Sequence, residues 1–164
     1  YPPSSISAHV SAVPNHQTGR VTDFSTRGNV AMAGAFGYEL DLTKLTVAEK
    51  ELVKQQVAQY HAYAPLVQDG DFYRLISPFE DENRCAWMSV SPDRSEALVT
   101  FVVPKTKVNF TSYLRLAGLD PVRFYEDSQP GAVRSGSLLM NAGLNLSRTW
   151  RDGESVLIHL KAVR

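Results

Sequence analysis

The sequence of 164 residues contains a single cysteine, Cys85. One thiol cannot form an internal disulfide, and chains without disulfides are typical of reducing compartments. We therefore expect a cytoplasmic protein. No histidine lies close to Cys85 in the sequence to activate its thiol, so we interpret this cysteine as unreactive.

The sequence also lacks a net charge and a long apolar run. Lys plus Arg and Asp plus Glu both number 17, whereas a nucleic-acid or anionic-membrane partner normally needs a basic surface. No apolar run approaches the roughly 20 residues that span a bilayer. Apolar residues still make up 43% of the chain, which is enough for a packed core. We expect a folded chain whose partners are neither nucleic acid nor membrane.

Up to residue 69 the pattern alternates short strands with helices. Apolar, β-compatible runs predict strands over 6–10 and 36–40, and helical spacing predicts helices over 25–33 and from Thr46 onward. Thr46 and Glu49 form a T-x-x-E capping box at the start of the second helix, and Pro65 is expected to end it. This strand–helix–strand–helix order predicts parallel strands covered by helices.

From residue 70 the pattern changes to strands separated by turn residues. Strands are predicted over 72–76, 86–90, 97–103, 113–116, 122–125, 138–140 and 156–160. Short strands at this spacing are typical of an antiparallel β-sandwich. We therefore divide the chain into residues 1–69, an α/β part, and residues 70–164, an all-β part.

The two tryptophans can serve either as core residues or as a surface on which a sugar ring stacks. Trp87 lies in an alternating strand between Ala86 and Met88, so we predict that it is buried. Trp150 precedes a turn, and its sequence context fits either role. A sugar-binding role for Trp150 would make the chain a stand-alone carbohydrate-binding β-sandwich module.

Several blocks along the chain resemble one family, in the same order. They include Y-P-P-S-S-I-S-A-H-V-S at 1–11, F-G-Y-E-L-D-L-T at 36–43, G-D-F-Y-R-L-I-S-P-F at 70–79 and L-R-L-A-G-L-D-P at 114–121. Together they resemble the C-terminal part of bacterial α-galactosidases of glycoside hydrolase family 36, in clan D. Ser7 departs from the pattern, in which a glycine is expected.

This resemblance implies a fold and a function. Residues 1–69 would be the last two β/α units of a (β/α)8 TIM barrel, and residues 70–164 a C-terminal antiparallel β-sandwich domain. The parent enzyme would hydrolyse terminal α-D-galactosyl residues of melibiose- and raffinose-type substrates with retention and without a cofactor. Its catalytic aspartates would precede Tyr1, so this chain alone is expected to be inactive. Its partners would be the rest of the parent enzyme, namely the N-terminal domain and the first six barrel strands, in a homo-oligomer.

Residues at and after the first strand are candidates for the rim of the substrate pocket, because the active sites of such barrels lie at the C-terminal ends of the strands. These candidates are His9, Ser11, Asn15 and His16. The spacing of the two histidines matches no zinc pattern, so we expect no metal site.

Glu39 and Asp41 lie at the end of the second predicted strand and leave two interpretations open. Glycoside hydrolysis needs two carboxylates, roughly 5 to 9 Å apart, and an independent small hydrolase would use this pair. The interpretation that we favour places Glu39 in a salt bridge at the rim and Asp41 in the turn before the long helix.

Overall fold

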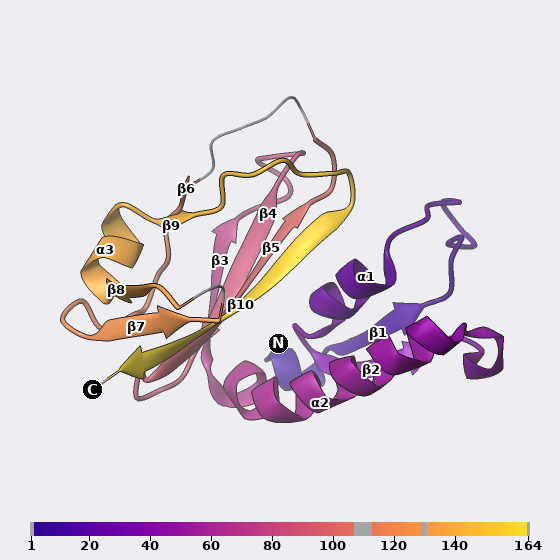
Figure 1. Cartoon of the computed structure of the whole chain (residues 1–164), viewed down its shortest axis with the longest axis horizontal. Coiled ribbons are helices and arrows are strands. Elements are labelled where there is room, and N and C mark those ends of the chain that lie inside the picture. Colours follow the sequence, from indigo (N-terminus) through magenta and orange to yellow (C-terminus); the bar gives the residue numbers. More distant parts are fainter. Residues whose placement is uncertain (1, 107–112, 129–130, 164) are drawn as a thin grey trace. The chain divides into compact units, whose positions relative to one another are not determined.

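The computed structural model describes residues 2–106, 113–128 and 131–163 (Figure 1). The chain divides into two compact units, residues 1–68 and 69–164. No helix in the described ranges is long and apolar enough to cross a bilayer. The two units are described separately.

The first unit contains two parallel strands and two α-helices. Strands β1 (Ser7–Ser11) and β2 (Ala35–Glu39) pair in parallel, with Ser7 opposite Ala35 and Ser11 opposite Glu39. The other elements are η1 (Pro3–Ser5), α1 (Phe24–Ala31), η2 (Leu42–Lys44) and α2 (Val47–Asp69). The parallel pair and the helix between its strands confirm the order predicted from the sequence.

One face of the parallel pair packs against the helices. The cluster on this face is apolar and consists of Val10, Phe24 and Ala31 with the partly buried Ala8, Phe36, Tyr38, Leu40, Leu45, Leu52 and Val53. Successive side chains of a strand point to opposite faces. The other face therefore carries the small and polar residues Ser7, His9 and Ser11 of β1 and Ala35, Gly37 and Glu39 of β2.

Gln56 of α2 ties this helix to both α1 and β2. Its amide nitrogen donates to the Phe24 carbonyl at 3.2 Å, and its carbonyl oxygen accepts from the Tyr38 hydroxyl at 2.8 Å. Burial raises the pKa of Tyr38 to about 12. Gly28 of α1 leaves room for this side chain, because a Cβ at residue 28 would lie 2.1 Å from the Gln56 amide nitrogen.

Helix α2 begins as predicted and ends later than predicted. The Thr46 backbone N–H donates to Glu49 Oε2 at 2.8 Å and the Glu49 N–H donates to the Thr46 hydroxyl at 3.2 Å, which confirms the capping box. The prediction that Pro65 ends the helix is wrong, since α2 continues through it to Asp69. A proline inside a helix costs about 3 kcal/mol. Leu66 and Val67 are buried immediately after it, and burial of two such side chains offsets a cost of that size.

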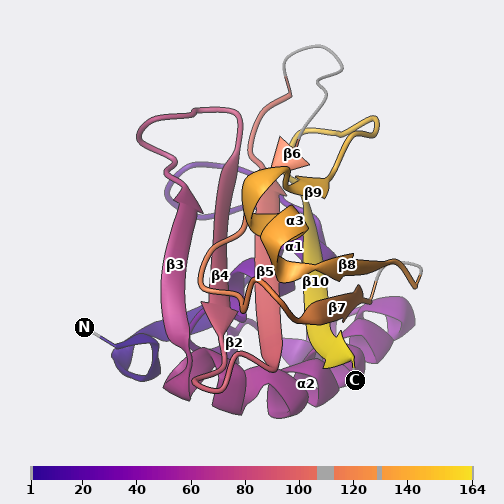
Figure 2. The ribbon, with the colours of Figure 1, turned by 90° about the vertical axis from the view of Figure 1, so that its left-hand side faces the viewer.

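The second unit is built on one antiparallel sheet of six strands in the order β3-β4-β5-β10-β7-β8 (Figure 2). Their bounds are β3 Asp71–Ile76, β4 Cys85–Val90, β5 Glu96–Val103, β7 Phe124–Asp127, β8 Val133–Ser135 and β10 Glu154–Val163. A second, two-stranded sheet pairs β6 (Tyr113–Leu114) with β9 (Leu144–Asn145). The predicted strands at 72–76, 86–90, 97–103 and 156–160 are therefore confirmed within a few residues.

The predicted strand at 138–140 is wrong, because these residues belong to helix α3 (Gly136–Asn141). The Ser135 hydroxyl caps this helix by accepting from the Leu138 N–H at 3.2 Å. Leu139 is fully buried and anchors the helix on the core. A three-residue apolar run has no periodicity that separates a strand from a single helical turn, so the sequence pattern could not make this distinction.

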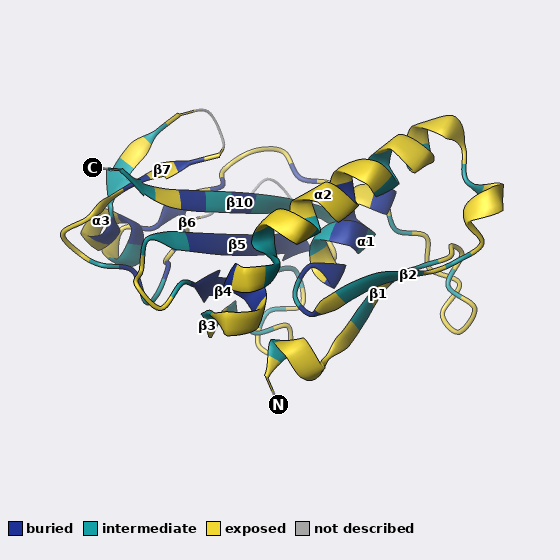
Figure 3. Cartoon of the chain, turned by 90° about the horizontal axis from the view of Figure 1, so that it is seen from below, coloured by how far each residue is buried: buried dark blue, intermediate teal, exposed yellow. Residues whose placement is uncertain are grey.

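The core of the second unit contains Trp150, for which the sequence left two roles open, and does not contain Trp87, which was predicted to be buried. Every residue of β5 from Ala97 to Val103 is buried, as the dark blue strand in Figure 3 shows. Trp150 joins this core with 6% of its surface exposed, and its ring centroid lies 5.2 Å from that of Phe101. Trp87 is only partly buried, because it points to the face of β4 opposite the core residues Ala86 and Met88. The prediction that Trp87 is a fully buried core residue is therefore wrong.

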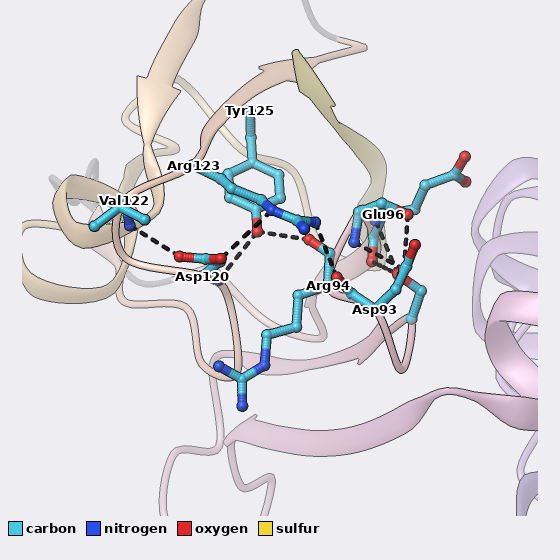
Figure 4. A network of polar contacts seen from close by, with 9 residues as sticks. Asp93, Arg94, Glu96, Asp120, Val122, Arg123 and Tyr125 are labelled. Carbon is cyan, nitrogen blue, oxygen red and sulfur yellow. Dashed lines mark hydrogen bonds and ion pairs between the residues drawn. The ribbon is translucent and has the colours of Figure 1, made fainter. Parts of the chain in front are cut away.

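Tyr125 of β7 connects its own strand to the segments that contain Arg94 and Asp120 (Figure 4). Its ring is fully buried. Its hydroxyl donates to the Arg94 carbonyl at 2.7 Å and accepts from the Asp120 N–H at 3.0 Å. The nearby turn is held by Asp93, whose Oδ1 accepts from the Ser91 hydroxyl at 2.7 Å and from the Ser95 N–H at 3.0 Å.

Candidate functional site

The C-terminal ends of β1 and β2 bring together two of the polar residues singled out in the sequence. His9 Nε2 lies 2.6 Å from Glu39 Oε2, on the face of the parallel pair that does not contact the helices. The side chains of His9 and Glu39 are 41% and 74% exposed, respectively. At this exposure the contact contributes little stability. Ser11 lies on the same face of β1 as His9, opposite Glu39 in the strand register.

Arg27 of α1 holds the end of β1 from the helical side. Its guanidinium donates from Nη1 to the Ser11 carbonyl. It also donates from Nε to the Thr22 carbonyl at 3.0 Å. It also lies over the Phe24 ring, 4.8 Å from the centroid. Burial lowers the pKa of Arg27, and the carboxylates of Glu49 and Asp23 oppose this shift. The sequence reasoning missed Arg27, because its partner is a backbone carbonyl that leaves no sequence signal.

The loop after β1 is ordered by Asn15. Its side-chain oxygen accepts from the Gln17 N–H at 3.1 Å and from the Thr18 N–H at 3.0 Å. The Asn15 backbone N–H donates to the Arg20 carbonyl at 2.9 Å, which closes the loop. His16 is exposed within the same loop. The Asn15 side chain thus shapes the loop that presents His16.

The contacts of Glu39 and Asp41 agree with the interpretation that we favoured, whereas the rim position of Glu39 stays a prediction. Glu39 pairs with His9, and Asp41 Oδ1 accepts from the Thr43 hydroxyl at 2.6 Å and from the Thr43 N–H at 3.0 Å in the turn before α2. The hydrogen bond from the Thr43 hydroxyl is the largest contribution that lowers the pKa of Asp41. A general acid needs a raised pKa, so Asp41 does not suit that role.

A hollow of about 250 Å³ adjoins this end of the first unit. Its charged lining residues are Arg27, Lys44, Asp41 and Glu49, two of each sign. Within the described ranges, no group of three or more His, Cys, Asp or Glu side chains is placed to hold a metal ion.

A second cavity lies inside the second unit, and the sequence did not predict it. It measures about 230 Å³ and is lined by residues of β7, β8, β9, β10 and the segment that ends at Trp150. Asp127 and Arg134 meet in its wall, with Asp127 Oδ2 at 2.7 Å from Arg134 Nη1. Of its polar and aromatic lining, the sequence reasoning had named only Trp150. The Asp127–Arg134 contact depends on the pairing of β7 with β8, which has no local signature.

Two family models match the chain, and between them they cover most of its length. The Melibiase model matches residues 1–70, and the model of the glycosyl hydrolase family 36 C-terminal domain matches residues 84–160. The α-galactosidase AgaA of Geobacillus stearothermophilus is 55% identical over 165 residues, which is 100% of this chain and 22% of that protein. The bifunctional α-galactosidase/sucrose kinase AgaSK of Mediterraneibacter gnavus is 50% identical over 89% of this chain and 16% of that protein.

Solved structures show the same similarity in three dimensions. A crystal structure of AgaA from Geobacillus stearothermophilus in complex with raffinose superimposes with a TM-score of 0.95 at 55% identity, over 99% of this chain and 23% of that one. The galactosidase domain of AgaSK also gives a TM-score of 0.95, at 44% identity over 99% of this chain and 23% of that one. The chain therefore spans less than a quarter of the length of these relatives.

Proposed function

Because the chain belongs to glycosyl hydrolase family 36, we propose that it is part of an α-galactosidase that hydrolyses terminal α-D-galactosyl residues with retention. The observation that carries this proposal is the 55% identity to an α-galactosidase over the whole chain. Melibiose- and raffinose-type sugars are the proposed substrates, supported by the raffinose complex of that relative. The chain matches 22% of the relative's length, which favours a part of an enzyme over a stand-alone carbohydrate-binding module.

In this proposal residues 1–69 are the last two β/α units of a (β/α)8 TIM barrel. The support is the parallel pair β1–β2 with helices on one face and small, polar side chains on the other. In such barrels the helices lie outside and the opposite face of each strand points inward. Residues 70–164 are the C-terminal antiparallel β-sandwich domain, supported by the six-stranded sheet and the β6–β9 pair.

The proposed partners of the chain are the rest of the parent enzyme and, through it, the galactoside. The rest comprises the N-terminal domain and the first six barrel strands, assembled in a homo-oligomer in the cytoplasm. The chain supplies no catalytic carboxylate in this proposal, since Glu39 and Asp41 are engaged by His9 and Thr43. Its contribution to substrate binding is the pocket rim formed by His9, Ser11, Asn15 and His16.

A chimaera tests the proposal directly. The matching 165 residues of the Geobacillus relative are replaced by this chain, and hydrolysis of an aryl α-galactoside and of raffinose is measured. We expect activity within about tenfold of the parent, which corresponds to a change in the activation barrier of about 1.4 kcal/mol or less. The isolated chain should show no turnover.

Two outcomes would contradict the proposal. One is a folded chimaera that binds no galactoside and has no activity. The other is turnover by the isolated chain that disappears in Glu39→Gln or Asp41→Asn, which would make this chain an independent hydrolase.

In the active chimaera, His9→Ala should raise KM more than it lowers kcat if His9 lies at the rim, whereas Lys54→Ala on the exposed side of α2 should change neither.

A further inference from the structure

We propose that His9, Gly37 and Glu39 form a sugar-binding surface on the face of the β1–β2 pair that does not contact the helices. His9 accepts a hydrogen bond from a hydroxyl of the α-galactoside through Nδ1, Glu39 positions the His9 ring for this contact, and Gly37 leaves room for the sugar. The inference rests on the proposed function, in which this face points into the pocket of an α-galactosidase.

The contact with Glu39 determines which nitrogen of the His9 ring can accept a hydrogen bond. Nε2 of His9 lies 2.6 Å from Oε2 of Glu39, which is a hydrogen-bonding distance. A carboxylate accepts hydrogen bonds and donates none, so the proton of this contact belongs to Nε2. The other nitrogen of the neutral ring, Nδ1, then carries a lone pair and is an acceptor. In the described part of the chain the contact with Glu39 is the one polar contact of His9, so Nδ1 is available to a hydroxyl donor.

A ligand can reach this pair of side chains. The side chain of His9 is 41% exposed, and that of Glu39 is 74% exposed. In the parallel register His9 lies opposite Gly37, and Ser11 lies opposite Glu39. These four residues share one face of the two strands, because residues two apart on a strand point the same way. A ligand that lies on this face therefore meets the His9 ring and the gap at Gly37 together.

Gly37 leaves a space beside His9 that the described residues do not fill. A Cβ at residue 37 would meet none of their atoms within 4 Å, apart from its two neighbours in sequence. Gly37 is not among the glycines with a positive φ, so its backbone does not require a glycine. Gly34 differs, since a Cβ there would lie 2.6 Å from the Ile6 carbonyl oxygen. A glycine weakens a strand, and inside one it often marks the close approach of a ligand or of another backbone.

The rest of this face suits a neutral ring that carries hydroxyl groups. Its other side chains are small, namely those of Ser7, Ser11 and Ala35. Small side chains let a ring lie close to the strands, and a serine hydroxyl both donates and accepts. A sugar supplies the hydroxyl donor that Nδ1 lacks, whereas the carboxylate of Glu39 repels an anion.

Kinetics of the active chimaera test the role of His9. His9→Ala should raise KM by about tenfold with little change in kcat, because one hydrogen bond to the substrate is lost. His9→Asn places an oxygen near the position of Nδ1 and should recover most of this loss, whereas His9→Gln places its amide near the position of Nε2 and should not. An effect on both an aryl α-galactoside and raffinose assigns the hydroxyl to the galactosyl ring. An effect on raffinose alone assigns it to the rest of the sugar.

A double-substitution cycle tests the role of Glu39. Glu39→Ala should raise KM by about threefold, as expected from the loss of an exposed contact. In the His9→Ala background the same substitution should have no effect, because Glu39 acts through the His9 ring. Glu51→Ala is the matched control, since it removes an exposed carboxylate of α2 that pairs with Lys54. It should leave KM unchanged in both backgrounds.

Thermal unfolding of the chimaera with and without galactose tests the role of Gly37. Gly37→Ala adds one methyl group to the proposed sugar space. We expect the sugar-free variant to unfold at the same temperature as the unchanged chimaera. Galactose should raise this temperature less in the variant, in proportion to a Kd that is at least about tenfold higher.

Three results would overturn the proposal. One is a His9→Ala chimaera with an unchanged KM for both substrates, and another is a Glu39→Ala effect that is the same with and without His9. The third is a sugar-free Gly37→Ala chimaera that unfolds at a lower temperature and keeps the full effect of galactose, since the glycine would then make room for another barrel strand. A folded chimaera that is inactive before any of these substitutions would refute the α-galactosidase proposal itself, and this one with it.

Discussion

Replacing Trp150 is the perturbation that we expect to destabilise the second unit most. Its ring is 6% exposed, packs on Phe101 at a centroid distance of 5.2 Å and is covered by Arg148 at 3.7 Å. Its Nε1–H donates to the Leu146 carbonyl at 2.9 Å. Truncation to alanine removes the apolar contacts, the cation–π contact and this hydrogen bond together.

The magnitude follows from these contacts. Truncation of a core aromatic to alanine costs about 3 to 5 kcal/mol, which includes the cavity that remains. The Leu146 carbonyl would lose its donor as well, and such a loss costs about 1 to 3 kcal/mol when the group stays buried. These terms overlap, so we expect about 4 to 5 kcal/mol for Trp150→Ala. Trp150→Phe keeps most of the apolar area and should cost about 1 to 2 kcal/mol through the lost hydrogen bond.

Trp87→Ala is the matched comparison, because it removes the same atoms from a partly buried position on β4. A partly buried ring on the face opposite the core loses less on truncation than a core ring does, so we expect about 1 to 2 kcal/mol. Hydrogen exchange of the β5 and β10 amides measures the opening of the second unit without interference from α2. If Trp87→Ala accelerates this exchange as much as Trp150→Ala does, the burial assigned to the two rings is wrong.

Two further predictions concern the hydrogen bonds of Tyr125 and Asp93 (Figure 4). Tyr125→Phe removes the hydroxyl that joins the Arg94 carbonyl to the Asp120 N–H, and should cost about 1 to 3 kcal/mol in the same exchange measurement; no change relative to the exposed control Tyr113→Phe would contradict the assigned hydrogen bonds. Hydrogen bonds, first of all from the Ser91 hydroxyl, lower the pKa of Asp93 from 3.8 to about 2. A group whose pKa is depressed on folding stabilises the fold above its unfolded pKa and loses that contribution as the pH falls through its folded pKa. The stability of the chain should therefore decline from about pH 4 to about pH 2 more steeply than that of Asp93→Asn. Urea unfolding midpoints across this range that fall in parallel for the two proteins would refute this linkage.

Local patterns in the sequence determined much of this structure. The T-x-x-E box predicted the start of α2 because both partners of a capping box lie within one turn. The alternation in β4 and the apolar run in β5 predicted two strands, since the strand period of two is a local property. The motif blocks indicated the family that the comparisons show, and motifs in sequence order need no tertiary information to be recognised.

Tertiary structure decided the features that depend on residues far apart in the sequence. Helix α2 continues past Pro65 because burial of Leu66 and Val67 offsets the local cost of the proline. Residues 138–140 form a helix and not a strand, which their short apolar run leaves open and the burial of Leu139 decides. Alternation correctly placed Trp87 and Met88 on opposite faces, but only the packed sheet shows which face is the core. The same holds for the sites. His9 meets Glu39 through the parallel register of two strands, and Asp127 meets Arg134 through the pairing of β7 with β8. Contacts of this kind are made by folding, so residue spacing along the chain carries no signal of them.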